Sequence, residues 1–262
     1  MTSIWIVLFA VTLVIMLPFC MISLQRRNLT WLDVAWSLGM AVGAVLLCAL
    51  SEGHYLRRIL TATIVLIWAS RLLKHLISNR VSGAEDGRYS DLRAAMRQPQ
   101  WIYVPLFYVV EALFVLMCLV PIQAAMSVSR PFGSAFDLAG LAIFALAIGG
   151  ESLADAQLER FRYCPSNAGR TCKVGLWRFS RHPNYFFEWL HWWSYVLFAV
   201  GTPQLLQSLT GPLLMYVFIR YITGIPHIER RSLRSRGDDY RAYQRTTNAF
   251  FPWMPRHQGA AE

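Results

Sequence analysis

One run of residues combines an amide, a carboxyl group and an imidazole at helical spacing. Asn184, Glu188, His191, Trp192 and Tyr195 follow one another at intervals that place all five on one face of a helix. A carboxyl group in an apolar setting keeps its proton near neutral pH and can donate it to a substrate oxygen. This face suits a flat, mostly apolar ligand with one or two polar groups, and an aromatic packing stripe would give the same pattern.

Cationic residues come directly before this face. Arg178, Arg181 and His182 precede Pro183, which suits the first turn of a helix because proline lacks the N–H that is unsatisfied there. Helix N-terminal amides and guanidinium groups bind phosphate and other anions. We therefore predict an anion site that includes Arg181 and His182.

Two other kinds of site receive less support. Glu188 and His191 have the spacing of half a di-iron site, but the other half needs a second such pair, and the six histidines are scattered. We predict no metal. A glycine-rich dinucleotide fingerprint after a strand is not found either, so any nucleotide would be held by loops and helix ends.

Membrane helices must position these groups. The chain is 55% hydrophobic, has a mean hydropathy of +0.37 and is only 15% charged, whereas soluble domains carry about 25% charged residues. A span needs roughly 20 apolar residues. We predict an all-α integral membrane bundle, a single domain over residues 1–262, with seven transmembrane helices near 4–24, 31–50, 59–77, 103–127, 136–153, 183–201 and 205–224.

The basic residues predict the orientation of these spans. The odd-numbered connections and the tail hold nineteen of the 25 arginines and lysines, and the even-numbered connections hold three. Positive charge stays on the cytoplasmic side. This places the N-terminus outside, the C-terminus in the cytoplasm, and an active site opening to the cytoplasm, in a bacterial inner membrane. The arginines would also contact anionic membrane lipid; we expect no nucleic acid and no obligate protein partner.

Several ionisable residues fall inside the predicted spans. Charges in the bilayer cost several kcal/mol, so they normally face the bundle interior or a polar cavity. Asp33, Arg71, Glu111, Glu188 and Arg220 are such residues. Trp36, three residues after Asp33, would complete the polar end of a pocket.

The motifs resemble the steroid 5-alpha-reductase family, and more closely bacterial membrane proteins that share its C-terminal domain. The likeness is strong over 150–255, in the run 175–185, Glu188, and the element formed by Tyr240, Tyr243 and 250–252. It is fainter over 28–90. Isoprenylcysteine and phospholipid methyltransferases share the Arg-His-Pro element.

The resemblance implies an oxidoreductase that acts on CH–CH groups with NADP as acceptor. It would use NADPH to reduce the conjugated double bond of a steroid-like 3-oxo-4-ene lipid, a small hydrophobic substrate entering from the bilayer. Carried over by position, the cofactor would contact Arg71, Asn79, Arg80, Asp155, Arg162, Arg170, Asn184, Glu229, Arg230 and Arg231.

The resemblance also implies roles at the substrate. Glu188 falls on the family's acid beside the substrate carbonyl, and Asp33 falls where animal members have a Gln-Glu pair; both are candidate catalytic residues. Trp68 replaces a tyrosine that helps to hold the carbonyl. With Trp36 and Trp192 it forms the predicted substrate site.

Two other functions stay open. A membrane methyltransferase would use S-adenosylmethionine, which has no phosphate and needs few arginines. A transporter or lipid-binding protein would tolerate loss of the cytoplasmic arginines, and the sequence shows no inverted repeat that would support transport.

Overall fold

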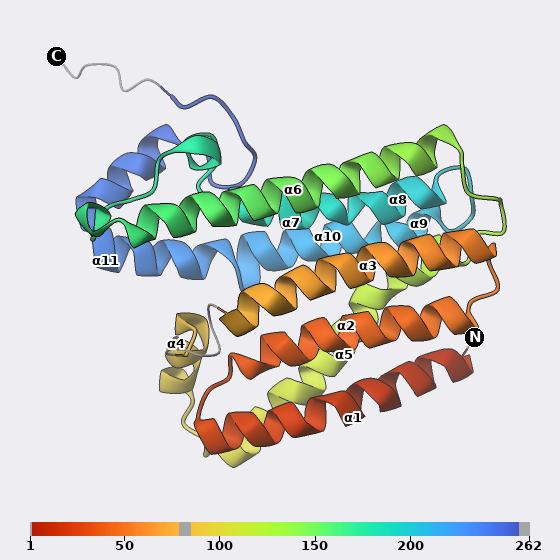
Figure 1. Ribbon diagram of the computed structural model, residues 1–262. Coiled ribbons are helices and arrows are strands. Elements are labelled where there is room, and N and C mark those ends of the chain that lie inside the picture. Colours follow the sequence, from red (N-terminus) through yellow and green to blue (C-terminus); the bar gives the residue numbers. More distant parts are fainter. Residues whose placement is uncertain (1, 79–84, 257–262) are drawn as a thin grey trace. The chain divides into compact units, whose positions relative to one another are not determined.

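The computed structural model describes residues 2–78 and 85–256. Across these ranges the regular structure is helical, without a strand, which confirms the all-α class. The chain divides into two compact units (Figure 1). Unit 1 contains residues 1–137 and 195–211, and unit 2 contains 138–194 and 212–262.

Unit 1 is built on four long helices. In α1 (Thr2–Arg26), α2 (Trp31–Leu50), α3 (Tyr55–Leu76) and α5 (Gln100–Met126), α2 packs between α1 and α3, and α5 contacts all three (Figure 1). Glycines allow the close approach of α2 and α5, because a Cβ on Gly43 would lie 2.5 Å from Leu119. The short helices α4 (Gly87–Ala95) and α9 (Leu205–Ser208) complete the unit.

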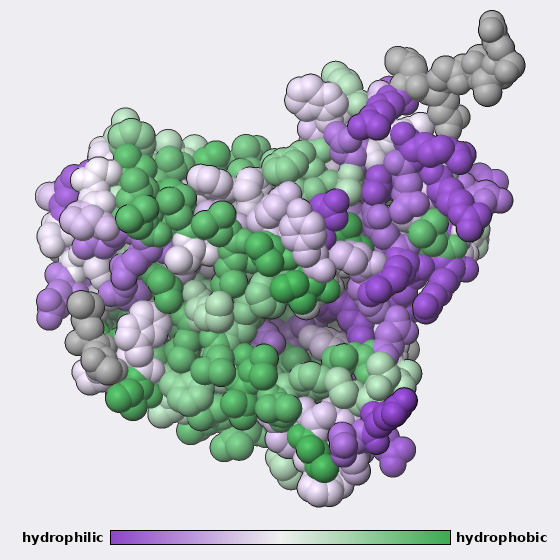
Figure 2. Space-filling view, turned by 180° about the vertical axis from the view of Figure 1, so that it is seen from behind, coloured by the Kyte–Doolittle hydropathy of each residue, from purple (hydrophilic) through white to green (hydrophobic). Residues whose placement is uncertain are grey.

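Unit 2 consists of α6, α7, α10 and α11 with their connections. The bounds are α6 (Ala135–Tyr163), η2 (Pro165–Asn167), η3 (Gly175–Arg178), α7 (Pro183–His191), α10 (Thr210–Val217), the π-helix η4 (Phe218–Ile222) and α11 (Ile225–Thr246). The indole N–H of Trp189 on α7 donates to the Pro212 carbonyl of α10 at 2.9 Å. In Figure 2 the hydrophilic residues of this unit gather over α11.

Six helices of the described chain are long and apolar enough to cross a membrane, whereas the sequence predicts seven spans. The difference lies in residues 183–201, which form α7 and a second short helix, α8 (Trp193–Ala199). Between them the Trp192 N–H bonds the carbonyl of Trp189, only three residues back, which tightens and interrupts the helix. The seventh span and the orientation of the termini therefore stay predictions.

Helix α6 is longer than the predicted span 136–153. It begins with a capping box, in which the Ser134 hydroxyl accepts from the Asp137 N–H and the Asp137 carboxylate accepts from the Ser134 N–H. It continues to Tyr163 because the charged residues after the apolar segment are good helix formers. Asp155 and Arg162, which we predicted beyond the span, therefore lie on the same helix as the span.

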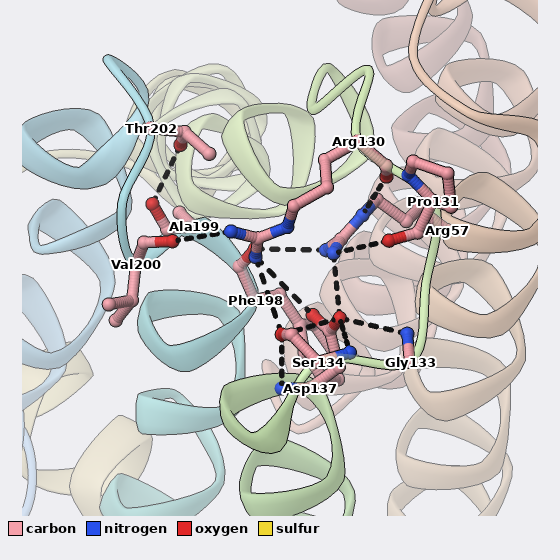
Figure 3. Close-up of polar contacts among 10 residues, drawn as sticks. All are labelled: Arg57, Arg130, Pro131, Gly133, Ser134, Asp137, Phe198, Ala199, Val200 and Thr202. Carbon is pink, nitrogen blue, oxygen red and sulfur yellow. Dashed lines mark hydrogen bonds and ion pairs between the residues drawn. The ribbon is translucent and has the colours of Figure 1, made fainter.

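A buried ion pair joins three separate segments of unit 1 (Figure 3). Arg57, with a side chain only 1% exposed, lies 2.7 Å from the carboxylate of Asp137, which is fully buried. The same guanidinium donates to the backbone carbonyls of Arg130 at 2.6 Å, Phe198 at 2.9 Å and Pro131 at 3.3 Å. Arg57 therefore fixes the start of α3, the start of α6 and the end of α8 to one another.

The carboxylate of Asp137 is equally well surrounded. One of its oxygens accepts from the backbone N–H of Gly133 at 3.0 Å and from the N–H and hydroxyl of Ser134, each at 2.8 Å. Arg130, whose side chain is 36% exposed, approaches the second oxygen at 3.9 Å and donates to the Val200 carbonyl. This second oxygen is buried and accepts no hydrogen bond within the described residues. A buried charge pair is tolerated when most of its remaining donors and acceptors are satisfied, as those of the first oxygen are.

We predict that Arg57→Ala lowers the free energy of unfolding by about 3–5 kcal/mol, because it leaves an unpaired buried carboxylate. Reversible unfolding in mixed detergent micelles would measure this loss. Arg130→Ala is the matched control, since it removes a half-exposed arginine from the same carboxylate and should cost less than about 1 kcal/mol. Equal, small losses for both variants would contradict a central role for Arg57.

Candidate functional site

Unit 1 brings a carboxylate and a phenol together at the start of α2. Asp33, in the first turn of α2, accepts a hydrogen bond from the Tyr89 hydroxyl at 2.6 Å and an ion-paired bond from Arg88 at 2.7 Å. Both partners lie on α4. Arg88 also bonds Asp86, the N-cap residue of α4, at 3.2 Å. Asp33 therefore accepts one hydrogen bond at each of its two carboxylate oxygens.

Tyr89 is a proton donor in this arrangement. Burial raises the pKa of the Tyr89 phenol well above its usual value, the negative charges of Asp33 and Glu111 act in the same direction, and Arg88 opposes them. The phenol therefore keeps its proton at neutral pH. Because the proton is already in place, the hydroxyl can redirect its hydrogen bond from the Asp33 carboxylate to a ligand oxygen.

Two of the predicted substrate residues lie in contact in the same unit. The rings of Trp36 and Trp68 are perpendicular, with centroids 5.3 Å apart, and Trp36 also stacks on Phe114. The buried indole N–H of Trp36 has no hydrogen-bond partner within residues 2–78 and 85–256, so it can donate to a bound ligand. Arg71 lies half-buried about one turn after Trp68 on α3.

In unit 2 the two segments that carry the family resemblance fold against each other. The Tyr243 hydroxyl donates to the carbonyls of Trp177 and, at 3.1 Å, Ser180. The Ser180 hydroxyl donates to the Phe250 carbonyl at 2.8 Å, and the Arg181 N–H bonds the Asn248 carbonyl at 2.9 Å. The run 175–185 and the tail element are therefore one local structure, although about 65 residues separate them.

Gly175 attaches this structure to α6. Two features favour glycine at this position. Its φ is +57°, in the left-handed region, and a Cβ would lie 2.4 Å from the side chain of Gln157. The side-chain amide oxygen of Gln157 accepts a hydrogen bond from the backbone N–H of Leu176 at 2.8 Å. The Trp177 indole N–H donates to the Ala154 carbonyl at 2.9 Å.

Three predicted cofactor residues bond one another inside this structure. Arg181 donates to Glu229 on α11 at 2.7 Å, and the His182 ring lies 3.4 Å from the same oxygen. Gln244 donates to the other Glu229 oxygen at 2.9 Å. Arg181 and Glu229 therefore neutralise each other and hold α11 against the residues that precede α7.

The pKa of the His182 imidazole lies below its usual value. Burial is the main cause, and the positive charges of Arg181 and Arg220 add to it, while the hydrogen bond and charge of Glu229 act in the opposite direction. His182 is buried and stacks on the Tyr185 ring. The histidine is neutral at pH 7 and stabilises the segment before α7.

The remaining predicted cofactor residues include an amide and acid pair. Asn184, in the first turn of α7, donates to Asp155 of α6 at 3.2 Å, and its carbonyl oxygen accepts from the Tyr185 N–H. Arg162 lies two turns after Asp155 on α6. The exposed predicted cofactor residues are Arg162, Arg170, Arg230 and Arg231.

Glu188 and His191 lie on α7 with little exposure. Their closest side-chain atoms are 4.0 Å apart, and Glu188 is 13% exposed. Trp192, fully buried, stands at the interruption after α7 and contacts the His191 ring. The predicted helical face is therefore continuous from Asn184 to His191, and Tyr195 belongs to α8.

Some predicted residues cannot be placed, and some structural partners were not predicted. Asn79 and Arg80 lie outside the described residues. Tyr89, Arg88 and Gln244 were missed. Asp86 before Gly87 is a helix N-cap signal that could have located α4, because its side chain accepts from the Arg88 N–H. No sequence signal pairs Tyr89 with Asp33, since 56 residues separate them.

The described helices define an all-α protein with several segments suited to crossing a membrane. The chain belongs to the family described as "Protein of unknown function (DUF1295)", which matches residues 19–247. An uncharacterized protein of Schizosaccharomyces pombe is 28% identical over 264 residues, which cover 88% of this chain and 74% of that relative. No solved structure matches the chain.

We predict that the stability of the protein falls as pH drops below about 6.5, the usual pKa of histidine. A lowered pKa in the folded state means that the unfolded chain binds the proton more readily, so stability is full above this pH and is lost below it. Thermal unfolding between about pH 5 and pH 8 would measure the slope. His182→Gln should flatten the acid limb and leave the slope above pH 7 unchanged; parallel curves for the two proteins would contradict this role.

Proposed function

We propose that the chain is an NADPH-dependent reductase of the conjugated double bond in a steroid-like 3-oxo-4-ene lipid. The observation that carries the proposal is the Tyr89 hydroxyl held 2.6 Å from the Asp33 carboxylate in a unit of apolar helices. A half-buried, protonated phenol is a suitable group to meet a developing enolate oxygen. By the family resemblance, Trp68 stands where other members have a tyrosine that helps to hold the substrate carbonyl. We assign that tyrosine's role as hydrogen-bond donor to Tyr89, which is held by Asp33.

The chain's own residues would act on the carbonyl end of the enone. NADPH, when bound, supplies a hydride to the β carbon. As the carbonyl oxygen gains charge, Tyr89 donates its proton to it and the C=C electron pair moves to form the enol. Return of the enol to the ketone leaves a proton on the α carbon, and water reprotonates Tyr89. Trp36 could donate a second hydrogen bond to the same oxygen.

Unit 2 has the groups that a dinucleotide requires. Asn184 and Asp155 offer a donor and acceptor pair suited to a carboxamide or ribose hydroxyl. The exposed arginines at positions 162, 170, 230 and 231 suit phosphate groups, which guanidinium binds in a bidentate manner. Glu188 and Trp192 on α7 stay candidates for the substrate side.

The proposal includes a topology. Seven spans, with α7 and α8 together forming the sixth, would place the N-terminus outside and α11 in the cytoplasm, so that the cofactor enters from the cytoplasm and the lipid from the bilayer. The exposed arginines of α11 support this orientation by the positive-inside rule. In a bacterium this is the inner membrane.

Two observations weigh against the alternatives. A transporter that alternates access needs segments that move against one another, whereas the buried Arg57 and Asp137 pair joins three segments of unit 1, and breaking such a pair costs roughly 3–5 kcal/mol. A methyltransferase that binds S-adenosylmethionine has no phosphate to place against four exposed arginines. We keep the methyltransferase as the second candidate because it shares the Arg-His-Pro element.

NADPH should raise the melting temperature of the purified protein more than NADH does, because only NADPH carries the additional 2′-phosphate for an arginine. Arg162→Ala should reduce this shift by at least half. Arg97→Ala, which removes an arginine after α4 in unit 1, is the matched control and should leave it intact. Stabilisation by S-adenosylmethionine and none by NADPH would favour the methyltransferase.

Tyr89→Phe should lower the turnover of a 4-ene-3-one steroid by about 100-fold or more, the usual contribution of a general acid, while NADPH binding is retained. Loss of NADPH absorbance measures turnover, and the thermal shift measures binding. Tyr55→Phe, at an exposed tyrosine of α3, serves as the control and should be active. Undiminished turnover of Tyr89→Phe would remove the phenol from the chemistry.

A further inference from the structure

Helix α4 is attached to unit 1 in a way that differs from its neighbours. None of its residues is buried, whereas α2, α3 and α5 each bury many apolar side chains. Helix docking normally derives its stability from buried apolar surface. The attachment of α4 has to come from polar contacts instead.

These polar contacts join α4 and the two residues before it to the connection between α1 and α2. The Glu85 carboxylate accepts from the Leu29 N–H at 2.8 Å, and the Asp86 N–H donates to the Thr30 hydroxyl at 3.0 Å. Arg93 pairs with Glu85 and donates to the carbonyl of Arg27. Hydrogen bonds of this kind contribute about 1 kcal/mol each, and those to charged groups more, so release of α4 costs several kcal/mol but leaves the apolar packing of α1, α2, α3 and α5 intact.

Arg88 is the residue that links this attachment to the chemistry. Its guanidinium lies between Asp33 at 2.7 Å and Asp86 at 3.2 Å, and its carbon lies 5.2 Å from the centre of the Tyr89 ring. The same side chain therefore pairs with the α2 carboxylate, the N-cap of α4 and the face of the phenol. When α4 leaves, Asp33 loses both the guanidinium and the phenol at once.

We propose that α4 is a releasable cap over Asp33, and that Arg88 is the positioning residue that couples docking of α4 to the placement of the Tyr89 hydroxyl. The cap is closed when Arg88 bridges Asp33 and Asp86, and only then does the phenol reach the carboxylate of α2. Opening gives substrate or water access to Asp33. The catalytic part of this inference rests on the proposed reductase function, and the structural part does not.

Hydrogen exchange of the full-length protein in lipid nanodiscs tests the cap directly. Arg88→Ala should speed exchange of the α4 amides by about tenfold, the effect of losing one charge-assisted contact, and leave α2 and α5 unchanged. Ser90→Ala is the matched control, because within residues 2–78 and 85–256 the Ser90 hydroxyl bonds only the Gly87 carbonyl of its own helix. Unchanged α4 exchange in Arg88→Ala, or faster exchange throughout unit 1, would overturn the cap.

Turnover of the enone tests the positioning role separately. Arg88→Ala should lower kcat about tenfold or more with an unchanged KM for NADPH, and Arg88→Lys should restore part of kcat because it keeps the positive charge beside Asp33. The positioning role would be overturned if Arg88→Ala raised the KM for NADPH and left kcat unchanged, or if Arg88→Lys recovered none of the lost kcat. If the wild-type protein reduces no enone, the proposed reductase function is wrong. The hydrogen-exchange result would still show whether α4 is a releasable cap.

Discussion

The ion pair between Arg57 and Asp137 is the interaction on which the architecture of unit 1 depends. A guanidinium and a carboxylate removed from water are stable only if most of their donors and acceptors find partners, and here backbone groups of residues 130–134 and of Phe198 supply many of them. The pair therefore does more than link two side chains. It fixes where α3 begins, where α6 begins and where α8 ends.

The two ends of α2 show two ways of handling buried charge. At its C-terminal end the backbone carbonyls of Cys48 and Ser51 accept from Arg58, which lies in the first turn of α3. At its N-terminal end Asp33 bonds side chains of the short helix α4, which buries no residue of its own. Backbone partners cannot leave without unfolding a helix end, whereas side chains of a short, exposed helix can. The N-terminal end of α2 is therefore the end that the proposed release of α4 would expose.

Unit 2 separates groups that support a site from groups that can contact a ligand. Arg181, His182 and Glu229 bond one another and hold α11 in place. Asn184 and Asp155 bond each other, and the side chains of Arg162, Arg170, Arg230 and Arg231 are exposed. A motif shared with methyltransferases, such as Arg-His-Pro, therefore indicates a way of attaching the tail helix and discriminates poorly between cofactors. In the proposed reductase, the exposed arginines are the groups that favour NADPH.

The sequence alone determined the features that depend on local pattern. Apolar runs predicted five of the long helices. Residue types also marked Asp33 and Trp36 as a pair, since a charge in an apolar span must face inward, and the family resemblance added Trp68.

Only the tertiary structure decided which distant residues meet. Tyr89 reaches Asp33, Glu229 reaches Arg181 and Arg57 reaches Asp137 across 48 to 80 residues of sequence, and neither spacing nor propensity encodes such contacts. The interruption of the helix at Trp192 could not be predicted from the sequence either, because hydropathy does not distinguish a continuous helix from two short ones. The packing of the whole fold determines which buried charges pair, so these partners could be identified only from the tertiary structure.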